Sequence, residues 1–269
     1  MAKRFHQLPK GRANLIRVLS SAGDVIRVDD VASTLQLDRT TAAQRLARWT
    51  EQGWLRRVGR GAYVAASIET MGSGRVLDDP WVLVPALFAP GYVGGRTAAV
   101  HWDLTEQIFR DIVLMTAQPV RQKNQERHGA YFSLKHISER KFFGTKHVWR
   151  HNTRVPISDV HRTVIDMLDD STVGGGIQHV ADCLAVYLRS VDRSDEKLVE
   201  YALRLGNGAV FKRLGFLAEQ LPSGARLALM CRHHLSGGHA QLDSNQDGTH
   251  VVTKWRLRVP QRWAREENI

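Results

Sequence analysis

At 269 residues, the chain is long enough to form one or two domains with a substantial core. Its 43% hydrophobic and 24% charged residues are typical of a globular protein and argue against a disordered one. The two cysteines lack CxxC spacing, and the most apolar window, residues 80–94, is short and broken by prolines, so we expect a soluble cytoplasmic protein without disulfides or a membrane span.

The formal net charge of +11 is unevenly distributed along the chain. Residues 1–65 hold 12 lysines and arginines against 5 acidic residues, whereas residues 66–269 hold 26 against 22. The N-terminal part therefore carries most of the positive excess, which favours a polyanionic partner for that part.

The chain begins with a predicted helix marked by Leu15, Ile16 and Leu19, which ends near Gly23. Residues 25–28 favour a short strand. A second, shorter helix follows, for which Asp29 or Asp30 is a suitable N-cap. Its predicted inner stripe consists of Val31, Ala32 and Leu35, and Gln36-Leu37 supplies a turn.

A third helix is predicted over residues 39–52, between Asp38 as N-cap and Gly53 as a C-terminal stop. With Leu46 set inward, a step of about 100° per residue places small and apolar side chains beside it: Ala42, Ala43, Trp49 and Thr50. The outer face then consists of Thr40, Thr41, Gln44, Arg45, Arg48 and Glu51. Two helices joined by so short a turn cross steeply, as in a helix-turn-helix.

The segment after Gly53 alternates like a β-hairpin. Residues 54–58 and 62–64 form the two predicted strands, and Gly59-Arg60-Gly61 suits a tight turn that places one arginine at the tip. This hairpin would be the wing of a winged helix-turn-helix.

The side chains on the outer face of the third helix and on the hairpin are of the types that bind DNA. In the major groove, arginine can donate two hydrogen bonds to guanine, glutamine can pair with adenine, and threonine offers a hydroxyl or a methyl group. Wing arginines would meet phosphates, which position the protein without reading sequence. The predicted DNA-binding residues are Arg39, Thr40, Thr41, Gln44, Arg45, Arg48, Arg56, Arg57 and Arg60. A winged helix that serves only as a protein-interaction module, or a merely solvated basic face, remains the alternative.

The remaining sequence favours an α+β domain rather than a βαβ repeat. A short buried helix is expected over residues 97–102, strands over residues 112–115, 130–137, 146–149 and 155–157, and helices over residues 161–168, 177–188, 198–205 and 210–221. Residues 251–259 are a late strand candidate. The predicted organisation is a winged helix in residues 1–66, a linker in residues 67–80, and an α+β domain in residues 81–269 with an unassigned tail after about residue 222.

Several segments resemble the signature segments of AbiEi-family antitoxins, which belong to type IV toxin-antitoxin and phage abortive-infection systems. They are LTEQIF (104–109), ERKFFG (139–144), ISDVHRTVIDML (157–168), GGGI (174–177) and FKRLGFL (211–217). The resemblance lies in their order and spacing, covers roughly residues 9–221 and includes the winged helix. It does not extend past Leu221.

The resemblance implies an antitoxin that represses its own operon at inverted repeats of double-stranded DNA. It also implies a second domain that counters a nucleotidyltransferase-like toxin without a stable complex, and no catalytic activity, cofactor or metal. The candidate antitoxin residues in these segments are Glu106, Gln107, Arg140, Lys141, Arg162, Asp166, Lys212 and Arg213. From the residues alone, Arg162 and Asp166 form an i,i+4 helix pair, and Lys212 and Arg213 are expected on an exposed helical face.

Three patterns leave an enzymatic alternative open. Asp111 with Glu139 and Lys141 spells the D…ExK pattern of Mg²⁺-dependent nucleases, which would suit a restriction-type protein. Cys231, His233, His234 and His239 are zinc-competent, although neighbouring histidines rarely face one metal. The glycines at 174–176 precede a helix and could cradle phosphate, but they lack the Lys-Ser/Thr of a P-loop, so a simple helix entry is the better interpretation.

Overall fold

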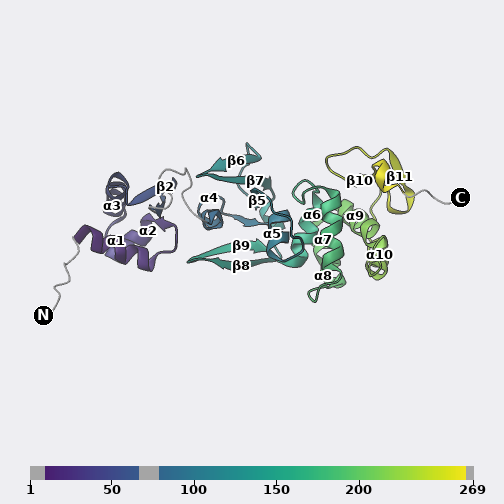
Figure 1. Cartoon of the computed structure of the whole chain (residues 1–269), viewed down its shortest axis with the longest axis horizontal. Helices are drawn as coiled ribbons and strands as arrows, with labels where there is room; N and C mark the ends of the chain where they lie inside the picture. The colour runs from purple at the N-terminus through teal and green to yellow at the C-terminus, as the bar shows by residue number, and fades with distance from the viewer. Residues whose placement is uncertain (1–9, 67–78, 265–269) are drawn as a thin grey trace. The chain divides into compact units, whose positions relative to one another are not determined.

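The computed structural model describes residues 10–66 and 79–264 (Figure 1). The chain divides into two compact units: one holds Met1–Ala89, Glu126–Ala130 and His147–Val155, and the other holds Pro90–Gln125, Tyr131–Lys146 and Pro156–Ile269. Residues 67–78, which make up nearly all of the predicted linker at 67–80, lie outside the described residues. The predicted domain boundaries therefore stay predictions. No helix in the described ranges has the length and apolarity needed to cross a membrane.

The first unit opens with a winged helix-turn-helix. Its elements are α1 (Lys10–Ser21), β1 (Ile26–Arg27), α2 (Val28–Leu35), α3 (Arg39–Glu51), β2 (Leu55–Gly59) and β3 (Ala62–Ala65). The strands form a sheet in the order β1-β3-β2, so the short strand after the first helix pairs with the wing as predicted. One core joins the helices to this sheet through Val18, Ile26, Val31, Leu46 and Trp49.

The ends of α3 follow the sequence signals. The Asp38 carboxylate accepts a hydrogen bond from the Thr41 backbone N–H at 2.9 Å, and Gly53 adopts a φ of 74° just past the helix. The start of α2 differs from the prediction. Its N-cap is Arg27, and Asp30 is the third helical residue, whose carboxylate accepts from the Arg27 backbone N–H at 2.6 Å. Neither Asp29 nor Asp30 is therefore the cap, because the helix begins before them.

Two apolar residues of the predicted helical patterns are exposed, and one of them, Ala43, was predicted to face inward. Ile16 lies on the outer side of α1, where Val18 fills the core instead. Ala43 is exposed on α3, while Ala42, Leu46 and Trp49 are buried. The core of a three-helix unit covers a narrow arc of each helix, and both residues lie outside that arc.

The wing sheet is also covered on its second face. A 3₁₀ helix (Pro80–Leu83) and α4 (Val84–Leu87) pack there. A Cβ at Gly59 would lie 2.8 Å from Leu87 Cδ2, and the Arg27 guanidinium donates to the Pro85 carbonyl at 3.2 Å. Leu87 of α4 thus contacts the wing next to its turn.

The chain continues into a six-stranded mixed sheet in the order β6-β7-β5-β4-β9-β8. Strand β5 runs parallel to β7, β4 runs parallel to β9, and β4 and β5 are antiparallel. The bounds are β4 (Gly91–Val93), β5 (Asp111–Thr116), β6 (Asn124–Arg127), β7 (Ala130–His136), β8 (Thr145–Arg150) and β9 (Thr153–Ser158). Strands β4 and β6 were not predicted, and the other four lie where the sequence placed them.

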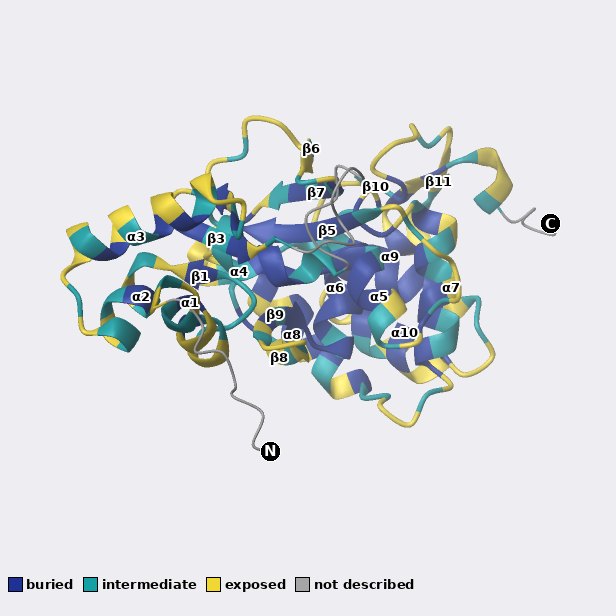
Figure 2. Ribbon diagram, turned by 60° about the vertical axis from the view of Figure 1, so that its left-hand side comes forward, coloured by how far each residue is buried: buried dark blue, intermediate teal, exposed yellow. Residues whose placement is uncertain are grey.

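Helices follow the strands, which confirms the predicted α+β class. They are α6 (Val160–Asp169), α7 (Ile177–Tyr187), α8 (Asp195–Leu205), α9 (Gly208–Glu219) and α10 (Ala225–Arg232), with α5 (Gly95–His101) between β4 and β5. Figure 2 shows α6 and α9 almost entirely buried, and α6 has eight buried residues out of ten. The second core is built around these two helices.

The tail after residue 222 is part of this core. The predicted single strand over residues 251–259 is wrong, because Arg256 adopts a left-handed φ of 51° and the chain reverses there. Two antiparallel strands result, β11 (His250–Val252) and β12 (Leu257–Val259), and β12 also pairs with β10 (Ala240–Gln241). Short 3₁₀ turns cover Thr253–Trp255 and Gln261–Trp263.

Replacement of Gly215 tests whether the tail belongs to the core. Gly215 lies in the middle of α9, where alanine would normally add about 0.5–1 kcal/mol of stability. Here an added Cβ would clash with the Trp255 ring. We expect Gly215→Ala to lower the free energy of unfolding by about 1–3 kcal/mol in urea denaturation. The matched control is Gly237→Ala, whose Cβ meets no atom within 4 Å. Equal stability of the two variants would show that Trp255 does not pack on α9.

Candidate nucleic-acid interface

The outer face of α3 presents a polar stripe. Thr40, Gln44 and Arg48 are spaced four residues apart, lie on one side of the helix and are all exposed. In Figure 2 this helix alternates between exposed and buried bands along its length. The opposite side, formed by Ala42, Leu46 and Trp49, is buried in the core of the unit. The helix is therefore held by its apolar side and offers its polar side to a partner.

The other candidate residues of α3 differ in the internal contacts that hold their side chains. The Thr41 hydroxyl donates to the Asp38 carboxylate at 2.6 Å, and this bond is the main cause that lowers the pKa of Asp38. Arg39 Nε lies 3.4 Å from the Asp29 carboxylate, with both side chains mostly exposed. Arg45 is half-buried at the edge of the stripe. Thr41 thus serves first in the helix cap, whereas Arg39 is tethered only by a weak surface ion pair.

Two small residues complete the exposed face. Ala43 and Ala47 lie beside Gln44 and Arg48 and are both exposed. Their methyl groups leave the helix surface low between the longer polar side chains, so a groove edge could approach the backbone closely. An alanine methyl group can also contact the methyl group of thymine. These two positions were not singled out from the sequence, because alanine is as common in a core as on a surface.

The wing carries its arginines in different directions. Arg60 is exposed at the tip, between Gly59 and Gly61, and Gly61 has a φ of 67°. Arg57 pairs with Tyr63 in the sheet, and its Nε donates to the Gly59 carbonyl at 3.1 Å. Arg56 pairs with buried Val64 and is half-buried. Because neighbouring residues of a strand point to opposite faces, Arg56 and Arg57 lie on different faces of the wing.

The basic groups of this surface remain largely uncompensated. Within the described part of the chain, the side chains of Gln44, Arg45, Arg48 and Arg60 make no hydrogen bond or ion pair with another described residue. Their donors are therefore available to an external partner. A convex helix with free guanidinium groups, in the same unit as a glycine-flanked arginine at a hairpin tip, has the charge and residue types of a duplex-binding surface.

Comparison with known families supports this assignment. Residues 15–66 match a family model described as "Transcriptional regulator, AbiEi antitoxin". Over these residues, the winged helix is similar to the AbiEi antitoxin regulators. The family resemblance seen in the sequence is confirmed over these residues, and this AbiEi-type winged helix is a DNA-binding regulatory module.

The fold of the chain has a counterpart among solved structures. The crystal structure of the RV2827C protein from Mycobacterium tuberculosis superposes with a TM-score of 0.61. The match covers 94% of this chain and 92% of that one, at 14% sequence identity. At this identity, the likeness shows a shared fold that extends beyond the AbiEi-type winged helix. No match was found among curated protein sequences.

Four of the eight candidate antitoxin residues are buried in the core of the second unit. Arg162 has 0% exposure, and its Nε donates to the Asp166 carboxylate at 2.8 Å. Asp166 also accepts from the Tyr92 hydroxyl at 3.0 Å, and burial with the nearby carboxylate raises the pKa of Tyr92. The two terminal nitrogens of Arg162 have no hydrogen-bond partner, and the guanidinium lies 4.1 Å from the Phe143 ring centroid. The predicted i,i+4 pair exists, but it is a core pair.

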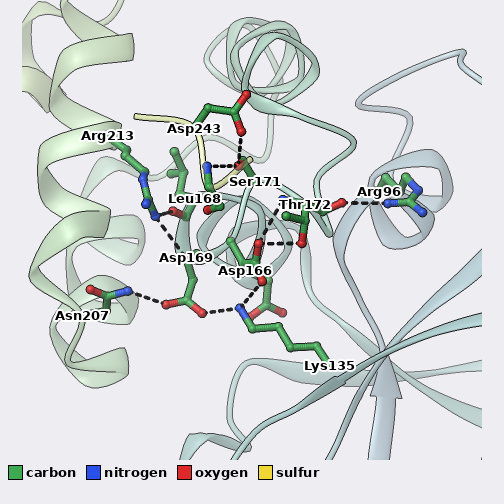
Figure 3. Close-up of polar contacts among 12 residues, drawn as sticks. Arg96, Lys135, Asp166, Leu168, Asp169, Ser171, Thr172, Asn207, Arg213 and Asp243 are labelled. Carbon is green, nitrogen blue, oxygen red and sulfur yellow. Dashed lines mark hydrogen bonds and ion pairs between the residues drawn. The ribbon is translucent and has the colours of Figure 1, made fainter. Parts of the chain in front are cut away.

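Lys212 and Arg213 do not lie on an exposed face, so that expectation is wrong. Both side chains donate to backbone carbonyl groups, and Figure 3 shows the Arg213 side chain leaving α9 toward them. Arg213 donates to the carbonyls of Leu168 and Asp169 at 2.8 and 3.0 Å. Lys212 donates to the carbonyls of Gly237 and Gly238 at 3.1 and 2.8 Å, and burial lowers its pKa. Arg213 thus satisfies the free carbonyls at the C-terminal end of α6.

The other four candidates stay near the surface. Glu106, Gln107 and Arg140 are exposed, and Lys141 is half-buried. The last two lie on a 3₁₀ turn, Glu139–Lys141, which follows β7. These four positions are the ones from the predicted set that a partner of the second unit could reach directly.

The nuclease pattern does not converge on one site. Asp111 lies opposite Tyr131, and Thr116 lies opposite His136, in the parallel pair of β5 and β7. Asp111 therefore begins its strand about 16 Å from the end of the sheet that leads to Glu139, given the rise of a strand. Arg96 also holds the Asp111 carboxylate at 2.5 Å. One Mg²⁺ cannot bridge these carboxylates.

The two remaining patterns are the cysteine with three histidines at residues 231–239 and the glycines at residues 174–176. Among the described residues, no group of three or more acidic, histidine or cysteine side chains is arranged to hold a metal. Cys231 is buried, and His233, His234 and His239 are exposed. The backbone N–H groups of Gly174, Gly175 and Gly176 already donate to the carbonyls of Ser171 and Thr172. These glycines form a tight turn into α7, whose donors are not free for phosphate.

The Arg162–Asp166 pair should control stability. Asp166→Ala leaves a buried guanidinium without its counter-ion, so we expect a loss of about 3–5 kcal/mol in the free energy of unfolding. Urea denaturation at neutral pH measures this. The control is Glu196→Ala, which removes an exposed ion pair with Arg226 and should cost less than about 1 kcal/mol. A stable Asp166→Ala variant that loses only antitoxin activity would instead place Asp166 in a functional contact.

Proposed function

We propose that the protein is a type IV antitoxin that binds operator DNA through its winged helix and represses its own operon. The exposed stripe of Thr40, Gln44 and Arg48, on a helix whose opposite side is buried, carries this proposal. The family match over the same residues supports it. The protein acts in the cytoplasm, needs no cofactor and is not an enzyme.

The proposed readout follows from the chemistry of each side chain. Helix α3 enters the major groove, where Arg45 and Arg48 donate to guanine and Gln44 pairs with adenine. Ala43 and Ala47 meet thymine methyl groups or simply allow close approach. Arg60 at the wing tip contacts phosphate, together with Arg57 and Arg39. Two copies bind an inverted repeat whose half-sites are about 34–36 Å apart, or a multiple of that distance.

The second unit supplies the antitoxin activity in this proposal. It counters a nucleotidyltransferase-like toxin without a stable complex, as the resemblance of its segments implies. Glu106, Gln107, Arg140 and Lys141 are its accessible candidates, whereas Arg162, Asp166, Lys212 and Arg213 maintain its fold. Loss of the buried set would therefore abolish activity through unfolding.

Recognition by α3 is tested by a gel shift on DNA from the region upstream of the gene. Arg45→Ala with Arg48→Ala should weaken binding to the operator by at least tenfold, because each bidentate contact is worth about 1–3 kcal/mol of discrimination. Binding to unrelated DNA should change much less. Unchanged operator affinity would exclude α3 as the recognition helix.

Arg60→Ala provides the contrast in the same assay. The substitution removes a phosphate contact, so the affinity for operator DNA and for an unrelated duplex should fall by the same factor. The slope of log K against log salt should fall by about one. A selective loss for the operator would mean that Arg60 reads bases.

Separation of the two activities tests the antitoxin half. The Arg45→Ala, Arg48→Ala variant should still rescue growth when it is expressed from an independent promoter with the cognate toxin. A reporter driven by the native promoter should be derepressed in the same cells. Size-exclusion chromatography of toxin and antitoxin should show no co-elution. Failure of rescue by this folded variant would show that neutralisation requires DNA binding.

A further inference from the structure

The β8–β9 hairpin has an unusual composition. Residues 145–158 contain no acidic side chain, but they include Lys146, Arg150 and Arg154 and two histidines. His147–Val155, which covers most of the hairpin, belongs to the same compact unit as the winged helix. The proposed DNA-binding unit therefore contains a second basic hairpin besides its wing.

This hairpin is fixed to the winged helix by polar contacts within that unit. The Asp24 carboxylate accepts from the Asn152 backbone N–H at 3.0 Å and from the Thr153 hydroxyl at 2.8 Å. Arg150 lies 4.3 Å from the Trp81 ring centroid and 3.9 Å from the Asp79 carboxylate. Arg150 thus serves as an anchor, and the turn cannot move independently of the segment between α1 and β1.

The free face of the hairpin combines an aromatic ring with cations. Trp149 has 67% of its surface exposed. The Arg154 guanidinium lies 6.0 Å from its ring centroid, and both Arg154 and His147 are exposed. An open indole face beside a guanidinium group can pack against a sugar or base while the cation meets phosphate.

Protection of a sheet edge does not explain this surface. Strand β8 is an edge of the six-stranded sheet, and edge strands commonly carry charges that prevent association with other sheets. Trp149 carries no charge and so does not provide this protection. What distinguishes the surface is the exposed ring together with several cations and no acidic residue, a combination that suits a polyanionic partner.

We propose that the β8–β9 hairpin is a second DNA-contacting element, which binds the duplex next to the half-site held by α3. Trp149 packs against the sugar edge of the minor groove, and Arg154 and His147 contact phosphates. This inference rests on the proposed operator binding, and it extends the footprint of each copy beyond the winged helix.

Fluorescence anisotropy on two duplexes tests it. One duplex carries the inverted repeat alone, and the other carries the same repeat with about one extra helical turn on each side. Wild-type protein should bind the longer duplex at least tenfold more tightly. Trp149→Ala with Arg154→Ala should remove this difference and lower the salt slope on the longer duplex by about one. Trp149→Phe with Arg154→Lys should retain most of it.

Controls separate this inference from the proposed function. Arg232→Ala removes an exposed cation of the second unit and should leave both affinities unchanged. Arg45→Ala with Arg48→Ala should weaken binding to both duplexes. If that variant loses affinity while the hairpin variant binds like wild type, the hairpin does not contact DNA and operator binding stands. If neither variant changes affinity, the proposed function itself fails. Loss of a dimer in light scattering by the hairpin variant would assign Trp149 to contacts between copies and overturn the inference.

Discussion

The second unit depends on a buried ion pair in the middle of its central helix. Arg162 and Asp166 are both withdrawn from water, and each alone would carry a large desolvation penalty. Asp166 of this pair holds α6 against Tyr92 of β4. At the start of the helix, the Asp159 carboxylate accepts a hydrogen bond from the Tyr201 hydroxyl of α8 at 2.8 Å. Arg213 then holds the other end of α6. One helix thereby sets the position of the sheet, α8 and α9.

These contacts change the meaning of the signature segments. The polar residues of ISDVHRTVIDML and FKRLGFL bond to one another, to backbone carbonyls or to tyrosine hydroxyls within the second unit. A resemblance that rests on such residues identifies a fold. The winged helix differs, because its exposed polar residues make few internal contacts and are free to vary with the DNA sequence.

Much of the winged helix could be predicted because its signals are local. A 3.6-residue period, a capping aspartate and paired glycines act within a few residues of each other. The Arg27 cap of α2 carries no such signal, since arginine is a common residue anywhere. The burial of Lys212 and Arg213 could not be predicted either, because their acceptors lie 25 to 45 residues away in the chain. The reversal at Arg256 could not be predicted, because residues 251–259 alternate like one continuous strand and arginine rarely marks a turn.

The first unit is assembled from three separate stretches of chain, since Glu126–Ala130 and His147–Val155 join Met1–Ala89. His128 bonds to the Val58 carbonyl close to the turn of the wing, as Asp24 bonds to the other hairpin. Such a module cannot be exchanged as a single cassette during evolution. A relative that acquired a new winged helix by recombination would also need matching hairpins. Changes of operator specificity should then accumulate as point substitutions on α3, while the scaffold that carries it is inherited whole.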